Sequence, residues 1–251
     1  GKPTLDALAA FANIYHGARA EKIREFSEKI LREHPLQALF AATHMSRDGR
    51  VIAKRPGMGF GDVNSGEYKT TLWAEMVKHY GMELGLIVQG EIWPALETLR
   101  LEHRLRAEDF IAIASNSPIV PTDRKRLMGR ALFAGYDNDF VVALHLLVPQ
   151  IEHMVRWHLK GVGVKTTTLD KDGIENENGL STLIEMPEVK KIFGEDLTFE
   201  LKALFCDAFG PNLRNELAHG LLTDEECQST HAIYAWWFGV KIVFNTFWNA
   251  A

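Results

Sequence analysis

The feature that most constrains the fold is the helical spacing of apolar residues through most of the chain. In residues 18–33 this spacing places one apolar stripe between charged faces, formed by Ile23, Phe26, Ile30 and Leu31. The same pattern predicts helices over about 67–80, 92–106, 123–134, 139–160 and 197–209. A capping box at Thr223 and Glu226 predicts the start of a last helix with a wide apolar face. We therefore expect an all-α fold with a helical bundle at the C-terminal end.

Glycine- and proline-containing segments interrupt this pattern at three places. Residues 45–66 predict a Gly-rich loop with a short strand or hairpin at about Arg50–Lys54. The prolines in 115–124 predict a boundary between an N-terminal helical region, 1–118, and a bundle, 119–251. Residues 161–179 are polar and glycine-containing, which predicts a mobile surface loop.

The Gly-rich loop also resembles a phosphate-binding loop, but its spacing is wrong. Gly61 and Gly66 have the right separation, yet two residues intervene before Lys69. A lysine in that position would not reach the phosphates, so a connecting loop is the better interpretation.

Composition limits the class of protein and its partners. The 251 residues are 46% hydrophobic and 24% charged, which is typical of a soluble protein, and Lys241 interrupts the longest apolar segment. The net charge of −5 argues against a protein that coats nucleic acid, although it permits a small nucleic-acid site. Cys206 and Cys227 form no disulfide or metal pattern, so a cytoplasmic protein is expected. We also expect no metal, no cofactor and no membrane attachment. Because the chain begins at Gly1, without Met or a signal pattern, an internal fragment or an artificial start is expected.

The segment "GPNLRNELAHGLL" carries the strongest candidate site. If Pro211 occupies the first position of a helix, Asn215 and His219 project within about 40° of each other, one turn apart. Arg214 is long enough to lean into the same space, and the start of a helix favours an anion. Histidine can move a proton, arginine can neutralise a phosphate and asparagine can hold an oxygen, which suits cleavage of a phosphodiester. If RNA is the substrate, its own 2′-hydroxyl can be the nucleophile.

A structural role for the same residues is an alternative on residue types alone. In that case Arg214 would pair with a carboxylate and His219 would be partly buried. Glu152 is a candidate supporting residue, because a carboxylate on the preceding helix could hold Arg214 in place. It could equally pair with Arg156, one turn along its own helix.

The motif "RNELAHG" resembles the Arg-Asn-x-x-x-His-Gly signature of the poorly characterised family known as domain of unknown function 4209. That family is in turn similar to HEPN domains, the α-helical class with an Arg-x4-6-His motif. The similarity extends to "LLVPQIEHMVRWHLKGVG" before the motif and to the long terminal helix after it, over about residues 121–251.

The resemblance implies a HEPN-like helical bundle that cuts or binds RNA. Active members work without metal, leave cyclic phosphate ends and set two motifs facing each other across a homodimer. Carried over, Arg214 would stabilise charge, Asn215 would position the phosphate and His219 would act as acid or base. The expected function is a metal-independent endoribonuclease, in one version a toxin-like effector with a neutralising partner protein. The alternatives are a non-catalytic module that binds nucleotide, RNA or protein, and a structural domain of a larger protein.

Overall fold

The computed structural model describes residues 1–46, 49–57 and 65–250, and these form a mostly helical protein with two small two-stranded hairpins. Part of the expected Gly-rich loop, residues 47–48 and 58–64 with Gly61 of the phosphate-loop motif, lies outside the described residues. The helices and strands are, in chain order, α1 (Thr4–Ala12), α2 (Ala20–Glu33), α3 (Leu36–Leu39), β1 (Ala42–Met45), β2 (Val51–Arg55), α4 (Gly66–Ile87), η1 (Val88–Ile92), α5 (Trp93–Glu102), α6 (Ala107–Asn116), α7 (Lys125–Tyr136), α8 (Phe140–Gly161), β3 (Thr167–Leu169), β4 (Glu175–Glu177), α9 (Leu180–Leu183), α10 (Pro187–Phe205), α11 (Leu213–Ala218), α12 (Asp224–Cys227) and α13 (Thr230–Trp248).

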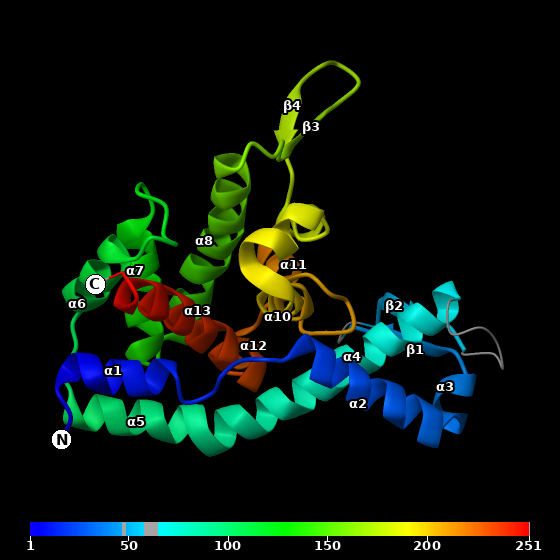
Figure 1. Ribbon diagram of the computed structural model, residues 1–251, viewed down its shortest axis with the longest axis horizontal. Coiled ribbons are helices and arrows are strands. Elements are labelled where there is room, and N and C mark those ends of the chain that lie inside the picture. Colours follow the sequence, from blue (N-terminus) through cyan, green and yellow to red (C-terminus); the bar gives the residue numbers. More distant parts are fainter. Residues whose placement is uncertain (47–48, 58–64, 251) are drawn as a thin grey trace.

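A long helical rod, made of α4, the π-helical turn η1 and α5, runs along one side of the molecule, with α1 and α2 beside it (Figure 1). The sequence predicted two separate helices here, over about 67–80 and 92–106, and this separation is wrong. Pro94, at the start of α5, has no N–H and would clash with the carbonyl four residues earlier in a regular α-helix. The wider π-helical turn η1 accommodates the proline without breaking the rod between α4 and α5.

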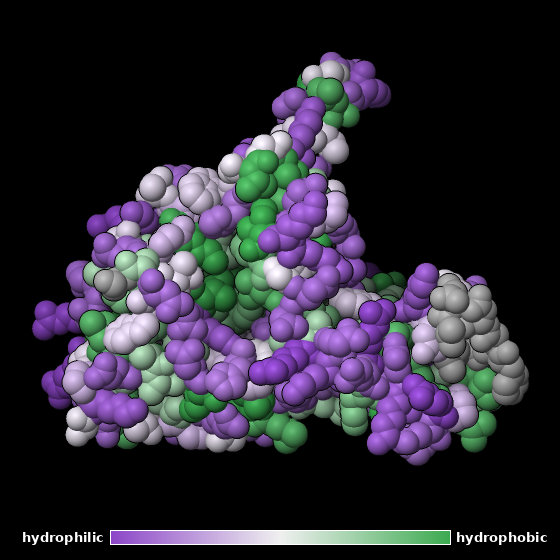
Figure 2. Space-filling model, viewed as in Figure 1, coloured by the Kyte–Doolittle hydropathy of each residue, from purple (hydrophilic) through white to green (hydrophobic). Residues whose placement is uncertain are grey.

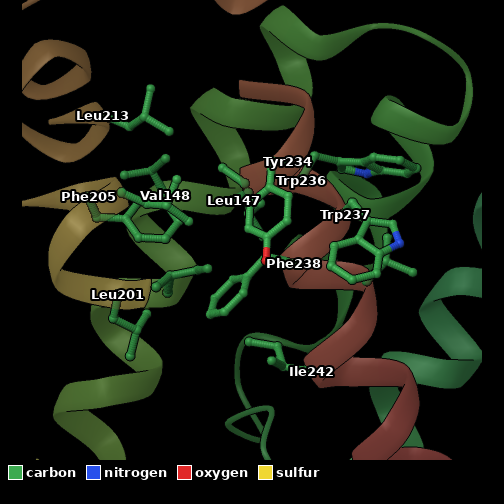
Figure 3. Packing of buried hydrophobic residues seen from close by; sticks show 14 of the residues in the cluster. Leu147, Val148, Leu201, Phe205, Leu213, Tyr234, Trp236, Trp237, Phe238 and Ile242 are labelled. Carbon is green, nitrogen blue, oxygen red and sulfur yellow. The ribbon is translucent and has the colours of Figure 1, made fainter. Parts of the chain in front are cut away.

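Helix α13 is the central element of the core and is buried on nearly all sides from Ala232 to Phe244, not on one face as expected. Figure 3 shows its aromatic residues packed against α8 and α10. The indole N–H groups of Trp236 and Trp237 donate to the carbonyls of Leu132 and Phe11, at 2.9 and 3.0 Å. The helix therefore ties the first helix of the chain to the bundle.

The capping box of Thr223 and Glu226 forms, but it begins a shorter helix than expected. Both reciprocal hydrogen bonds are present, and they open α12, which is one turn long. Helix α13 begins separately, where the Ser229 hydroxyl accepts the N–H of Ala232. A second capping signal so close to the first splits the predicted helix in two.

A buried carboxylate fixes the N-terminal segment to the bundle. Glu200 on α10 accepts the N–H of Ala18 at 2.6 Å and the hydroxyls of Tyr80 and Tyr234 at 3.2 and 2.9 Å. Burial raises the pKa of Glu200, and the hydrogen bonds from Tyr234 and Ala18 oppose that rise. The division into regions 1–118 and 119–251 stays a prediction.

The two hairpins differ from the expectation of one short hairpin or loop insertion. The strand expected at Arg50–Lys54 is found as β2, and it pairs antiparallel with β1. The expected loop at 161–179 contains a second hairpin, β3–β4, which projects from the body of the molecule (Figure 2). Its turn forms because the Asp170 carboxylate accepts the N–H groups of Asp172 and Ile174, both at 2.9 Å.

Helices α6 and α7 approach each other so closely that we expect Gly129→Ala to destabilise the protein. A Cβ atom at Gly129 would lie 2.5 Å from the Cα of Ile111, a backbone atom that cannot move aside locally. Overpacking of this kind costs about 1–3 kcal/mol. Urea unfolding should show this loss, whereas Gly85→Ala on α4, where a Cβ meets nothing within 4 Å, should stabilise by about 0.5–1 kcal/mol. Equal effects of the two substitutions would contradict the packing of α6 on α7.

Within the described residues, no helix combines the length and the apolar character that crossing a membrane requires.

Candidate functional site

Helix α11 carries the Arg-Asn-x-x-x-His motif and is held in place by one buried residue. Leu213 is 2% exposed, and Figure 3 shows it above Phe205 of α10 and Val148 of α8. Pro211 lies in the turn before the helix, so its expected place at the first helical position is wrong. Asn212, in the left-handed conformation with φ of 48°, reverses the chain instead.

The start of α11 offers less to an anion than the sequence predicted. The helix has six residues, and the N–H groups of Asn215 and Glu216 both donate to the carbonyl of Asn212, at 2.9 and 3.1 Å. Two of the amides expected to face a phosphate are therefore occupied within the turn. The binding of an anion here would depend on side chains.

Arg214 is oriented by an ion pair with Glu152 of α8. Its Nε donates to Glu152 Oε2 at 2.8 Å, while the arginine side chain remains 29% exposed. The guanidinium also lies against Gly179, since a Cβ atom there would come within 2.9 Å of Arg214 Nη2. Neither Nη atom of Arg214 makes a hydrogen bond with any residue that the structure describes.

Glu152 satisfies both of the alternatives that its sequence position left open. Its Oε1 accepts a hydrogen bond from Nη2 of Arg156 at 2.7 Å. Its Oε2 accepts hydrogen bonds from Nε of Arg214 and from the backbone N–H of Leu180, the latter at 3.1 Å. Arg156 also donates to the Asn178 carbonyl at 2.8 Å. The carboxylate thus joins α8, the exit from the second hairpin, and α11.

The protonation of Glu152 follows from these contacts. Burial by itself would raise the pKa of this carboxyl, but hydrogen bonds from Arg214, Arg156 and the Leu180 amide outweigh burial and hold the pKa below its ordinary value. Glu152 is therefore an anion at neutral pH. It acts as a fixed support for two arginines and not as a proton donor.

Asn215 and His219 lie one turn apart, as the spacing predicted. The His219 N–H donates to the Asn215 carbonyl at 3.1 Å, although His219 itself follows the last residue of α11. Asn215 is half-buried and His219 is exposed. In the described part of the chain, neither side chain has a hydrogen-bond partner. The partly buried histidine of the structural alternative is thus not found.

The neighbouring thiol is not a nucleophile. Burial raises the pKa of Cys206, at the end of α10, to about 12. A hydrogen bond with Ser181 and the charge of Arg214 lower this pKa but do not outweigh burial. The thiol is therefore protonated at neutral pH and unreactive. No group of three His, Cys, Asp or Glu side chains within the described residues is placed to hold a metal ion.

Two cavities flank the turn before α11. One, of about 490 Å³, is lined by Leu213 and Glu216, on a different face of α11 from Arg214. The other, of about 670 Å³, lies beneath the β1–β2 hairpin and is lined by His44, Glu75 and His231 among others. The sequence interpretation named none of these three residues. They come from distant segments and form no local motif.

No protein-family model, no curated protein and no solved structure matches this chain.

Proposed function

We propose that this protein is a metal-independent endoribonuclease of HEPN type. The observation that carries the proposal is the arrangement of Arg214, which is fixed by Glu152 at 2.8 Å yet 29% exposed, on the same short helix that ends at the exposed His219. An arginine held in this way can meet a phosphate without first having to be ordered.

Each residue of the motif has a role in this proposal. RNA supplies the nucleophile, because the 2′-hydroxyl attacks the adjacent phosphorus, the P–O5′ bond breaks and a 2′,3′-cyclic phosphate forms. His219 takes the proton of the 2′-hydroxyl or gives a proton to the leaving 5′-oxygen. Arg214 stabilises charge on the non-bridging oxygens, and Asn215 donates its amide N–H to one of them.

A second candidate function is non-catalytic binding of RNA or a nucleotide phosphate. One observation favours it: no described residue hydrogen-bonds to the His219 ring. A catalytic histidine is commonly oriented by a third group, and a histidine that only binds does not need one. In this version Arg214 holds a phosphate and no bond is broken.

An oligonucleotide made as RNA and as DNA of the same sequence separates the two functions. We expect the protein to cut the RNA in excess chelator and to leave the DNA intact, because only the RNA carries the internal nucleophile. Gel analysis of both time courses measures this. Binding of the RNA without cleavage would support the second candidate, and cleavage of the DNA at the same rate would contradict the proposed chemistry.

A further inference from the structure

The cavity beneath the β1–β2 hairpin has the size and depth of a ligand site. Its volume of about 670 Å³ falls within the range of about 300–1,000 Å³ usual for small-molecule pockets. Its lining includes the core residues Val77, Leu84 and Leu204, which are 3%, 0% and 0% exposed. The cavity therefore reaches from the hairpin down to the hydrophobic core.

The face of the hairpin that covers this cavity carries two alanines, one histidine and one arginine, and no large apolar residue. Ala42 pairs with Arg55 and His44 pairs with Ala53, so these four residues share one face of the hairpin, and all four are half-buried. A hairpin that only packed on a core would turn its large apolar residues inward. Here Met45 and Val51 are 60% and 53% exposed instead.

Hydrogen-bonding groups converge on the cavity from α4 and α13. Lys78 and His79 contact Glu75 through its Oε1, at 2.9 and 3.0 Å, and no described residue donates a hydrogen bond to its Oε2. His231 lines the cavity near Gly81, whose Cβ would lie 3.2 Å from the ring Nε2. Burial lowers the pKa of His231, so the neutral ring offers one donor and one acceptor.

An aromatic contact completes the wall. The rings of His44 and Phe209 meet edge to face at a centroid distance of 5.1 Å, and both line the cavity. Unpaired RNA bases are recognised by such surfaces, through stacking on aromatic rings and hydrogen bonds to the base edges. A carboxylate such as Glu75 accepts hydrogen bonds from exocyclic amino groups, which adenine, cytosine and guanine carry and uracil lacks.

The cavity also lies close to the motif helix. Pro211 lines it and precedes Arg214 by three residues, so their Cα atoms are at most about 11 Å apart. We propose that this cavity holds one unpaired, amino-bearing nucleobase of the RNA, close in the strand to the phosphate that Arg214 contacts. The inference rests on the proposed function for its substrate, but its binding test does not require cleavage.

Titration of the protein with the four nucleoside 5′-monophosphates, followed by calorimetry, tests the inference. We expect the adenosine, cytidine or guanosine nucleotide to bind at least about tenfold more tightly than the uridine nucleotide, which lacks an amino group. Glu75→Gln should remove that preference, because a charged acceptor is lost. Ala42→Phe should fill the cavity from the hairpin and abolish binding, whereas Thr43→Phe, on the exposed face of the same strand, should leave it unchanged.

The outcomes are distinguishable from those of the cleavage assay. Equal binding of all four nucleotides, binding of none, or binding unaffected by Ala42→Phe would overturn the base site. Circular dichroism of each variant checks that it is folded. A wild-type protein that binds an amino-bearing nucleotide and cuts no RNA would keep the base site and remove the proposed ribonuclease activity.

Discussion

His219→Ala should reduce the rate of RNA cleavage by about 10²- to 10⁴-fold, the range that a general acid or base contributes. The ring is exposed at the end of α11 and has no partner within the described residues, so its removal leaves no buried group unsatisfied. The folded structure should therefore be unchanged, and stability should differ by no more than about 0.5 kcal/mol.

The matched control is His34→Ala, which removes an exposed histidine at the end of α2. Single-turnover cleavage of a labelled RNA measures both variants against the wild type. We expect the His34 variant to cut at the wild-type rate. If both variants lose the same activity, or neither loses any, His219 is not the acid or base.

Glu152→Ala should have the largest effect on stability, a loss of about 2–3 kcal/mol at pH 7. The substitution removes the shared partner of Arg156 and Arg214, which are 13% and 29% exposed. Breaking a fully buried ion pair costs about 3–5 kcal/mol, and the remaining exposure of these arginines reduces that figure. Urea unfolding at pH 7 measures the difference, and Lys29→Ala, which removes an exposed ion pair with Glu33, should cost less than about 0.5 kcal/mol.

The contribution of Glu152 should also depend on pH in one direction. Its pKa is lower in the folded protein than the ordinary value of 4.5, so the unfolded chain binds more protons between the two values. The stabilisation is therefore present above about pH 4.5 and is lost as the pH falls through the folded pKa. The difference in the free energy of unfolding between wild type and Glu152→Ala should become smaller below that pH. A gap that widens on acidification would contradict the ion-pair account.

The main helices could be predicted from the sequence because their apolar spacing is local. Helix α2 begins at Ala20 and ends at Glu33, within two residues of the prediction. The junction at Pro94 was missed, because a proline usually ends a helix and only the packing of the rod shows that η1 carries the chain through. Helix α8 likewise continues through Pro149, although a proline inside a helix removes one backbone hydrogen bond.

The candidate site was partly predictable for a similar reason. The spacing of Asn215 and His219 depends on one helical turn, which sequence gives directly. The sequence could not show that Glu152 contacts both Arg156 and Arg214. Arg156 is four residues away on the same helix, but Arg214 is 62 residues away, so that contact depends on the tertiary structure. The cavity of His44, Glu75 and His231 depends wholly on contacts between distant segments.

The analysis of RNA 3′ ends tests the central claim most directly. Wild-type protein and His219→Ala are incubated with one RNA in excess chelator, and the product ends are identified by mass spectrometry. The account predicts 2′,3′-cyclic phosphate ends from the wild type and none from the variant. Product ends with a free 3′-hydroxyl, or cyclic ends in equal amounts from both proteins, would contradict it.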